Sequence, residues 1–310
     1  MTVIPTSSAD AAPVPARAKR PGAFGRALRN PSVIIGGAVV IIVALLALLA
    51  PFLDTVDPTA INPSAGNRDP GAQSTFRTDT GERIRVTHKL GTDSLGRDTY
   101  SRVLYGARVT LLIGLISALV SITIGLMIGL MAGYFRAADA IIMRVMDGLM
   151  AIPAILLAVS LVSIFKAGLL AVIVAITIPE VPRVVRLVRS VVLSVREEPY
   201  VEAARASGTP TVKLLWRHVL PNTIAPLIVQ GTFICASAML VESILSFLGV
   251  GMPADIPTWG NVMAEGRQVF RLQQHNILYP GIMLAVTVLA INMLGDGLRD
   301  TLDPKLAKRV

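Results

Sequence analysis

The sequence predicts an all-α polytopic membrane protein with six transmembrane helices. Hydrophobic residues make up 53% of the 310 residues and charged residues only 16%, against about 25% in a soluble domain. The mean hydropathy is +0.64. The apolar residues form uninterrupted runs of about 20 residues, the length that crosses ~30 Å of hydrocarbon. Because the runs do not alternate, and backbone groups must be paired within lipid, we expect helices rather than a barrel.

The expected spans are, in chain order, Val33–Leu53, Val109–Phe135, Ala140–Phe165, Gly168–Val188, Thr223–Phe247 and Ile277–Leu298. Pro153 and Pro179 fall inside the third and fourth spans, where a proline frees a backbone carbonyl and permits a kink.

Three glycines in the second span repeat every four residues: Gly125, Gly129 and Gly133. They form one smooth helix face that another backbone can approach closely. That backbone belongs either to this chain or to a second membrane subunit.

Basic residues gather in the short segments that would lie on one side of the membrane. Under the positive-inside rule they place both termini and the long polar segment 195–222 in the cytoplasm. These residues are Arg136, Arg144, Arg183, Arg186, Arg189, Arg196, Arg205, Lys213, Arg217, Lys305, Lys308 and Arg309. The rule also explains the net charge of +9, so we expect no nucleic-acid partner.

The segments outside the spans divide the chain into three regions. Residues 1–30 have the composition of a disordered cytoplasmic tail. Residues 31–104 hold the first helix, which is too long for a cleaved signal, and an extracytoplasmic segment. Within that segment 54–82 read as loop and the fold of 54–96 stays open. Residues 105–303 form the core. The lone cysteine, Cys235, excludes a disulfide within the chain.

The polar segment 195–222 predicts two short helices joined by a sharp turn. Pro199 suits the first turn of one helix, and Gly208 suits the left-handed position after its end. Thr209 and Pro210 suit the N-cap and first position of the second helix. Val212, Leu215, Trp216 and Val219 would form its apolar stripe, and Pro221-Asn222 would stop it.

The small residues Ala203, Ala204 and Ala206 suit close insertion into a groove of another protein. The alternative is a hairpin that lies on lipid headgroups.

Several motifs together resemble the C-type permease of dipeptide and oligopeptide ABC importers. Glu202-Ala-Ala, Gly208 and Leu220-Pro221 are similar to the EAA loop of ABC importer permeases. The others are Leu90-Gly-Thr-Asp-Ser-Leu-Gly-Arg-Asp98, Leu245-Ser-Phe-Leu-Gly249, Thr258-Trp-Gly260, Gly295-Asp-Gly-Leu-Arg-Asp300 and Leu302-Asp-Pro304. The resemblance runs from about residue 24 to 306.

This resemblance implies a type I ABC importer permease fold in the bacterial cytoplasmic membrane. It implies that Glu202, Ala203, Ala204, Gly208, Leu220 and Pro221 form the loop that couples the chain to an ATPase. Its partners would be a second permease in a heterodimer, two ATP-binding subunits, an extracytoplasmic solute-binding protein and membrane lipid. The substrate would be a di- or oligopeptide, with nickel, glutathione and haem as alternatives.

The sequence contains no glycine-rich loop ending in Gly-Lys-Ser/Thr, so it cannot cradle ATP phosphates in the Walker manner. We therefore expect no catalytic residues, no metal ligands and no cofactor on this chain, with ATP and Mg bound by partner subunits.

Four polar residues interrupt the apolar spans: Asp147, Glu242, Asn292 and Asp296, the last of which we expect to help fix the end of the sixth span. Charges there cost about 2.5–3.5 kcal/mol, so each needs a reason. Glu242 and Asn292 are candidates for the translocation path, and an interhelical hydrogen bond is the alternative for Glu242. For Asp147 we expect a local ion pair with Arg144.

The sequence gives little support to two other functions, an intramembrane hydrolase and an ion-coupled carrier. An intramembrane hydrolase would need a base in a span, but His88, His218 and His275 all fall in expected loops. An ion-coupled carrier would often show paired broken helices in two repeats, which the sequence lacks.

Overall fold

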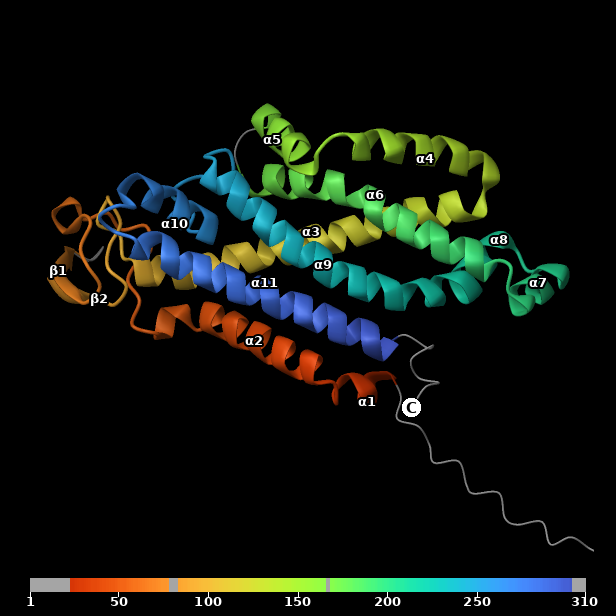
Figure 1. The fold of residues 1–310 in the computed structure, drawn as a ribbon, viewed down its shortest axis with the longest axis horizontal. Helices are drawn as coiled ribbons and strands as arrows, with labels where there is room; N and C mark the ends of the chain where they lie inside the picture. The colour runs from red at the N-terminus through yellow and green to blue at the C-terminus, as the bar shows by residue number, and fades with distance from the viewer. Residues whose placement is uncertain (1–22, 78–82, 166–167, 303–310) are drawn as a thin grey trace, which may run out of the picture.

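A computed structural model describes residues 23–77, 83–165 and 168–302, and Figure 1 shows a long helical bundle with a strand pair at one end. Its helices are α1 (Ala23–Ala27), α2 (Pro31–Leu48), α3 (Thr99–Tyr134), α4 (Arg136–Ala151), α5 (Ala154–Ile164), α6 (Leu169–Val195), α7 (Pro199–Ala206), α8 (Thr211–Leu214), α9 (Leu220–Phe247), α10 (Trp259–Gly266) and α11 (His275–Leu302). Short 3₁₀ turns occupy Ala50–Phe52, Pro63–Ala65 and Arg267–Val269, and Leu215–Val219 form a π turn. Most of the expected tail lies outside the described residues, and α1 forms near its end.

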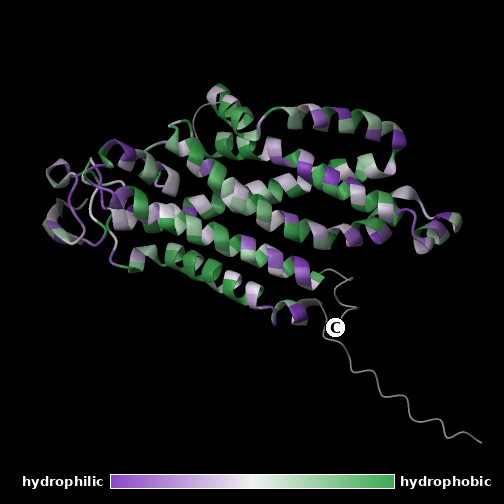
Figure 2. Ribbon diagram, in the orientation of Figure 1, coloured by the Kyte–Doolittle hydropathy of each residue, from purple (hydrophilic) through white to green (hydrophobic). Residues whose placement is uncertain are grey.

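Among the described residues, four helical segments are long and apolar enough to cross a membrane: α2, α3, Thr211–Phe247 and α11. The bent pair α4 and α5 would make a fifth. The expected fourth span lies in α6, which carries Glu180, Arg183 and Arg186 in its middle and therefore lacks an uninterrupted apolar run of bilayer length. Figure 2 shows mostly apolar residues along α2, and polar residues around the strand pair, near α7 and also along α4 and α6.

The expected third span is broken rather than continuous. The chain bends by 90° between α4 and α5. Ile152, just before Pro153, is extended, with φ −89° and ψ 128°. A proline ring disfavours the helical conformation for the residue that precedes it, so the helix ends there.

The helix α3 begins at Thr99, ten residues before the expected start at Val109. Asp98 caps it: the carboxylate Oδ2 accepts hydrogen bonds from the Ser101 backbone N at 2.7 Å and from Ser101 Oγ at 2.6 Å. At 1.5 Å per residue α3 is ~54 Å long, which exceeds the ~30 Å of hydrocarbon. Its first turns carry the charged Arg102 and Arg108, so we expect these turns to extend beyond the apolar layer.

The three spaced glycines of α3 pack within this chain. A Cβ added at Gly129 would lie 2.6 Å from Val188 Cβ, and one added at Gly133 would lie 2.5 Å from Val192 Cβ. Gly125 faces Val184 in the same way. Equal spacing in both helices means that α3 and α6 run parallel in constant register, so the glycine face is an internal contact.

The segment expected to be loop, residues 54–82, contains a strand, so the prediction of loop is wrong for Ala72–Arg77. The strands β1 (Ala72–Arg77) and β2 (Arg83–His88) pair antiparallel with Ala72 opposite His88. His88 holds the pair to the bundle, because its Nδ1 lies 2.8 Å from Asp98 Oδ1 and its Nε2 lies 2.7 Å from Ser74 Oγ.

The motif Leu90–Asp98 forms a buried charge network at this end of the bundle. Asp93 Oδ2 accepts from Arg97 Nε at 2.7 Å and from Arg102 Nη1 at 2.9 Å. Glu265 of α10 pairs with both arginines, and its Oε1 accepts from Arg102 Nη2 at 3.1 Å. The network joins the segment that precedes α3 to α3 itself and to α10.

The expected pairing of Asp147 with Arg144 is wrong. Asp147 Oδ1 instead accepts from Arg186 Nη2 of α6 at 2.6 Å. Asp139 of α4 makes a second such bond, from Arg189 Nη2 at 2.7 Å. The two carboxylates of α4 face the basic side of α6, because packing between the helices decides which charges meet.

Candidate functional site

The segment 195–222, which the resemblance predicts to be the coupling loop and which is called so below, lies at the end of the bundle opposite the strand pair (Figure 1). Its first helix, α7, begins with Pro199 and has Glu198 as its N-cap. A proline in the first turn lacks only an N–H that would be unpaired there anyway. Glu202 lies in the first turn of α7, where its charge favours the positive end of the helix dipole.

Gly208 reverses the chain after α7, as predicted. Its φ is +78°, in the left-handed region. The Gly208 N donates to the Arg205 carbonyl at 3.0 Å, and the Thr209 N donates to the Ala204 carbonyl at 3.1 Å. This pair of bonds is the Schellman motif, which satisfies carbonyls at a helix end. A Cβ added at Gly208 would meet nothing within 4 Å, so only the backbone conformation requires glycine within the chain.

The second helix differs from the prediction at both ends. Its N-cap is Pro210, not Thr209, and α8 begins at Thr211. Pro221-Asn222 does not stop it, because the π turn Leu215–Val219 carries the chain into α9. The ring of a proline clashes with the carbonyl four residues earlier, and the wider π turn relieves that clash. The segment Thr211–Phe247 is therefore one long element.

Three side chains anchor the coupling loop in the core. Val201, Leu214 and Val219 are at most 2% exposed and pack in one cluster with Val188 and Val192 of α6. The predicted apolar stripe is only partly buried, because Val212 and Trp216 are 68% and 60% exposed. The loop is thus joined to α6 while it keeps apolar side chains on its outer surface.

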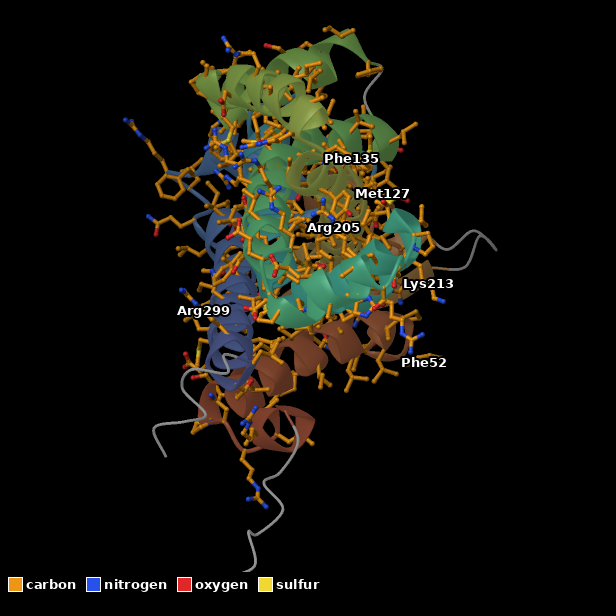
Figure 3. The ribbon with its side chains drawn as sticks, turned by 90° about the vertical axis from the view of Figure 1, so that its right-hand side faces the viewer. Phe52, Met127, Phe135, Arg205, Lys213 and Arg299 are labelled. Carbon is orange, nitrogen blue, oxygen red and sulfur yellow. The ribbon has the colours of Figure 1, made fainter. Side chains whose placement is uncertain are left out.

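The outer face of α7 carries the small residues. Glu202, Ala203 and Gly208 are exposed, whereas Ala204 is half-buried against the core. Figure 3 looks onto this end of the bundle, where α7 and α8 lie towards the viewer with Arg205 and Lys213 labelled. Leu220 is half-buried and Pro221 is exposed at the start of α9. The predicted coupling residues therefore lie together at one end of the helical bundle.

A hydrogen-bond clamp that the sequence analysis missed closes the coupling loop. Asn222 Nδ2 donates to the Tyr200 hydroxyl at 3.1 Å and to the His218 carbonyl at 2.7 Å. The Tyr200 and His218 rings lie 6.4 Å apart. The clamp joins α7 to the start of α9, and the polar Asn222 beside Pro221 was its only sequence signal.

We expect Asn222→Ala to loosen this clamp, since two exposed hydrogen bonds contribute about 1 kcal/mol each. The substitution should lower by a fewfold the transport that the resemblance implies for this chain. Transport rate in reconstituted vesicles measures the effect. Tyr200→Phe removes one of the two bonds and is the matched control, with a smaller loss expected. Transport by the Asn222→Ala variant at the parent rate would show that the clamp has no role.

The two candidates for the translocation path lie in different surroundings. Glu242 is fully buried in α9, and its Oε1 accepts from Ser246 Oγ at 2.8 Å. Asn292 is half-buried in α11. Among the residues that the structure describes, no hydrogen bond joins Glu242 to Asn292.

A charged pair that the sequence analysis did not single out lies in the middle of α6. Arg183 Nη1 donates to Glu180 Oε1 at 3.1 Å and to Oε2 at 3.2 Å. Ser237 of α9 donates to the same Glu180 Oε1 at 3.2 Å. An acid three residues before a base inside an apolar helix is the signal that could have found it.

Comparison with known families gives two matches that together cover most of the chain. Residues 105–308 match the family described as Binding-protein-dependent transport system inner membrane component. Residues 22–70 match the N-terminal TM domain of oligopeptide transport permease C.

Individual relatives are similar over most of their length. The chain is 51% identical to a protein of Sinorhizobium fredii named probable peptide ABC transporter permease protein, over 91% of this chain and 92% of that one. It is 37% identical to the dipeptide transport system permease protein DppC of Alkalihalophilus pseudofirmus, over 92% and 89%. It is 38% identical to the glutathione transport system permease protein GsiD of Pectobacterium atrosepticum, over 71% and 73%.

Among solved structures, the chain resembles the inward-facing MetNI methionine ABC transporter. The TM-score is 0.53 at 21% sequence identity, over 65% of this chain and 96% of that one. At this identity the likeness concerns the fold alone.

Proposed function

The chain belongs to the binding-protein-dependent transport system inner membrane components, and from that premise we propose that it is the C-type permease subunit of a peptide importer. Relatives named for peptides, dipeptides and glutathione support a short peptide as the substrate class. The permease is not itself an enzyme, because ATP hydrolysis in this family takes place on separate ATPase subunits. ATP and Mg would bind there and not on this chain.

The observation that carries the proposal is the attachment of the coupling loop. Its outer face is exposed, while Val201, Leu214 and Val219 are buried among the valines of α6. A movement of α7 therefore moves α6 and α9 as well, because a packed interior transmits displacement. ATP binding by the partner subunits would bias the permease between two conformations through Glu202, Ala203, Ala204, Gly208, Leu220 and Pro221.

We propose six membrane crossings, with α4 and α5 as a bent third crossing and α6 as the fourth. With six crossings of the bacterial inner membrane, both termini and the coupling loop lie on the same side. We propose that this side is the cytoplasm. The basic residues beside the loop support this orientation. Residues 31–104 then hold the first crossing and the external segment, and 105–303 form the core.

The complete importer would contain a second, different permease, two ATP-binding subunits and an extracytoplasmic binding protein. Lipid would cover the apolar helix surfaces. The long apolar α2 runs along the bundle beside α11, and the strand pair lies at the end opposite the coupling loop (Figure 1). Glu242 and Asn292 stay candidates for contact with the substrate in the crossing path.

Two measurements test the proposal. In a Cys235→Ala background, the thiol of Ala203→Cys should react with a membrane-impermeant reagent in inside-out vesicles only. Proteoliposomes of the full complex should take up a dipeptide when supplied with ATP and the binding protein. Labelling from the external face would overturn the orientation. Uptake of nickel or haem without uptake of dipeptides, longer peptides or glutathione would overturn the substrate class.

A further inference from the structure

The pair of Glu180 and Arg183 is unequally exposed. The Glu180 side chain is 6% exposed and held by Ser237, whereas the Arg183 side chain is 51% exposed. The carboxylate is thus fixed between α6 and α9, and it holds a guanidinium group that points out of the packed bundle. A guanidinium so placed keeps further N–H donors for another acceptor, since it has five in all.

The pair lies in the interior of the apolar layer. On α6, Arg183 is preceded by ~21 Å of helix and followed by ~18 Å, at 1.5 Å per residue. Its neighbour Val184 packs on Gly125, which lies within the apolar part of α3. Ser237 lies in the middle of α9, another helix long and apolar enough to span. Three helices therefore place the pair far from both ends.

Lipid is a poor environment for an exposed arginine at this depth. A charged side chain near the helix centre is costly in lipid, and such residues face the bundle interior or a water-filled cavity. The opposite face of α6 is already packed against α3 through Val184, Val188 and Val192. The surface around Arg183 must therefore face water. This water lies either in an open cavity or between this chain and a second subunit.

Prolines add polar groups at the same level. Pro179 and Pro182 flank Glu180 within α6. Each lacks the N–H that would donate to the carbonyl four residues earlier, so the Ala175 and Ile178 carbonyls lose their usual helical partner. Ala175 is 0% exposed, so only the half-buried Ile178 can offer a free carbonyl beside the positive charge of Arg183. One acceptor next to a guanidinium group suits a ligand with both a donor and a carboxylate.

We propose that Arg183, oriented by Glu180 and Ser237, lines the water-filled crossing path and binds the carboxylate of a peptide on its way through. This inference rests on the proposed function, which supplies the peptide and the second permease. A guanidinium binds a carboxylate through two parallel N–H donors, a geometry that lysine lacks. Glu180 balances the charge of Arg183 when no peptide is bound. The carboxylate of the peptide therefore binds weakly and is released again.

The first test measures access to water and needs no substrate. Because Cys235 is the only cysteine, Cys235→Ala gives a cysteine-free chain. In the assembled complex, the thiol of Arg183→Cys should react with a charged, water-soluble methanethiosulfonate reagent. The control is Leu289→Cys on α11, 61% exposed on an apolar helix, which should stay unreactive. Equal lack of reaction at both positions would overturn the inference.

The second test separates a substrate contact from a structural ion pair. Arg183→Gln should lower uptake of a free dipeptide about tenfold, the effect of losing a charged hydrogen bond. The double variant Glu180→Gln with Arg183→Gln removes the buried charge that Arg183 neutralises. It should remain about as slow, because the contact with the peptide is still missing. Recovery of the parent rate in the double variant would show a structural pair and overturn the inference.

These experiments distinguish a failure of the proposed function from a failure of the inference about Arg183. A parent complex that takes up no peptide would count against the proposed function, while the labelling at position 183 would still judge whether this surface faces water. Binding of the dipeptide to the separate binding protein, measured alongside, should be the same for every variant.

Discussion

Replacing Gly208 with valine is expected to abolish most peptide uptake, by more than tenfold, while the chain stays in the membrane. A β-branched residue at φ +78° is a steric outlier that costs at least about 1–2 kcal/mol. The strain falls on the Schellman turn that sets α7 against α8, so α7 would present its outer face in the wrong position. Uptake and ATPase rates, measured together in proteoliposomes, should show hydrolysis that no longer drives transport.

Gly208→Asn is the matched control for this prediction. Asparagine tolerates the left-handed conformation, and an added Cβ meets nothing within 4 Å. We therefore expect the asparagine variant to keep most of its uptake. Parent-level uptake in the valine variant would argue against a coupling role for the turn. An equal loss in both variants would instead mean that an ATPase approaches the glycine too closely for any side chain.

Gly129→Leu is expected to prevent stable packing of the core. Even the Cβ of the new side chain would lie 2.6 Å from Val188 Cβ and 3.1 Å from the Val185 carbonyl oxygen. The helices would have to separate, and overpacking of a close contact costs about 1–3 kcal/mol or more. A lower midpoint of thermal unfolding in detergent, with reduced yield of the assembled complex, would show the effect.

Gly148→Leu provides the matched control. Gly148 lies in α4, also a long helix, but a Cβ added there meets nothing within 4 Å. The same substitution at this exposed position should leave the unfolding midpoint within a few degrees of the parent value, as surface substitutions usually change stability by about 0.5 kcal/mol or less. Equal thermal stability of the two variants would contradict the close packing of α3 and α6.

Local signals in the sequence were sufficient for features that depend on one or two residues. Gly208 adopts the predicted left-handed conformation, and Pro199 begins α7, because both preferences arise from the backbone of the residue itself. The end predicted at Pro221 was wrong for the opposite reason. A π turn upstream removes the expected clash, and no single residue in Leu215–Val219 signals such a turn.

Pairings between distant residues could not be predicted in the same way. Asp147 has a basic residue one turn away, yet it bonds to Arg186 of another helix. Glu180 and Arg183 are close in sequence, but only the packing of α6 against α9 shows that one is buried beside Ser237 and the other exposed. Electrostatic partners follow the positions of helices in space, which the spacing of charges along one helix does not define.

The amino-acid sequence alone determined that this is a membrane protein, which family it resembles and where the chain turns after α7. Those properties follow from hydropathy, charge distribution and the conformational limits of proline and glycine, all of which act over a few residues. The tertiary structure decided that the glycine face of α3 packs on the valines of α6, that the coupling loop is anchored by three buried side chains, and that Arg183 is exposed in the middle of α6. Each of these depends on contacts between segments far apart in the chain, and such contacts exist only once the helices have packed.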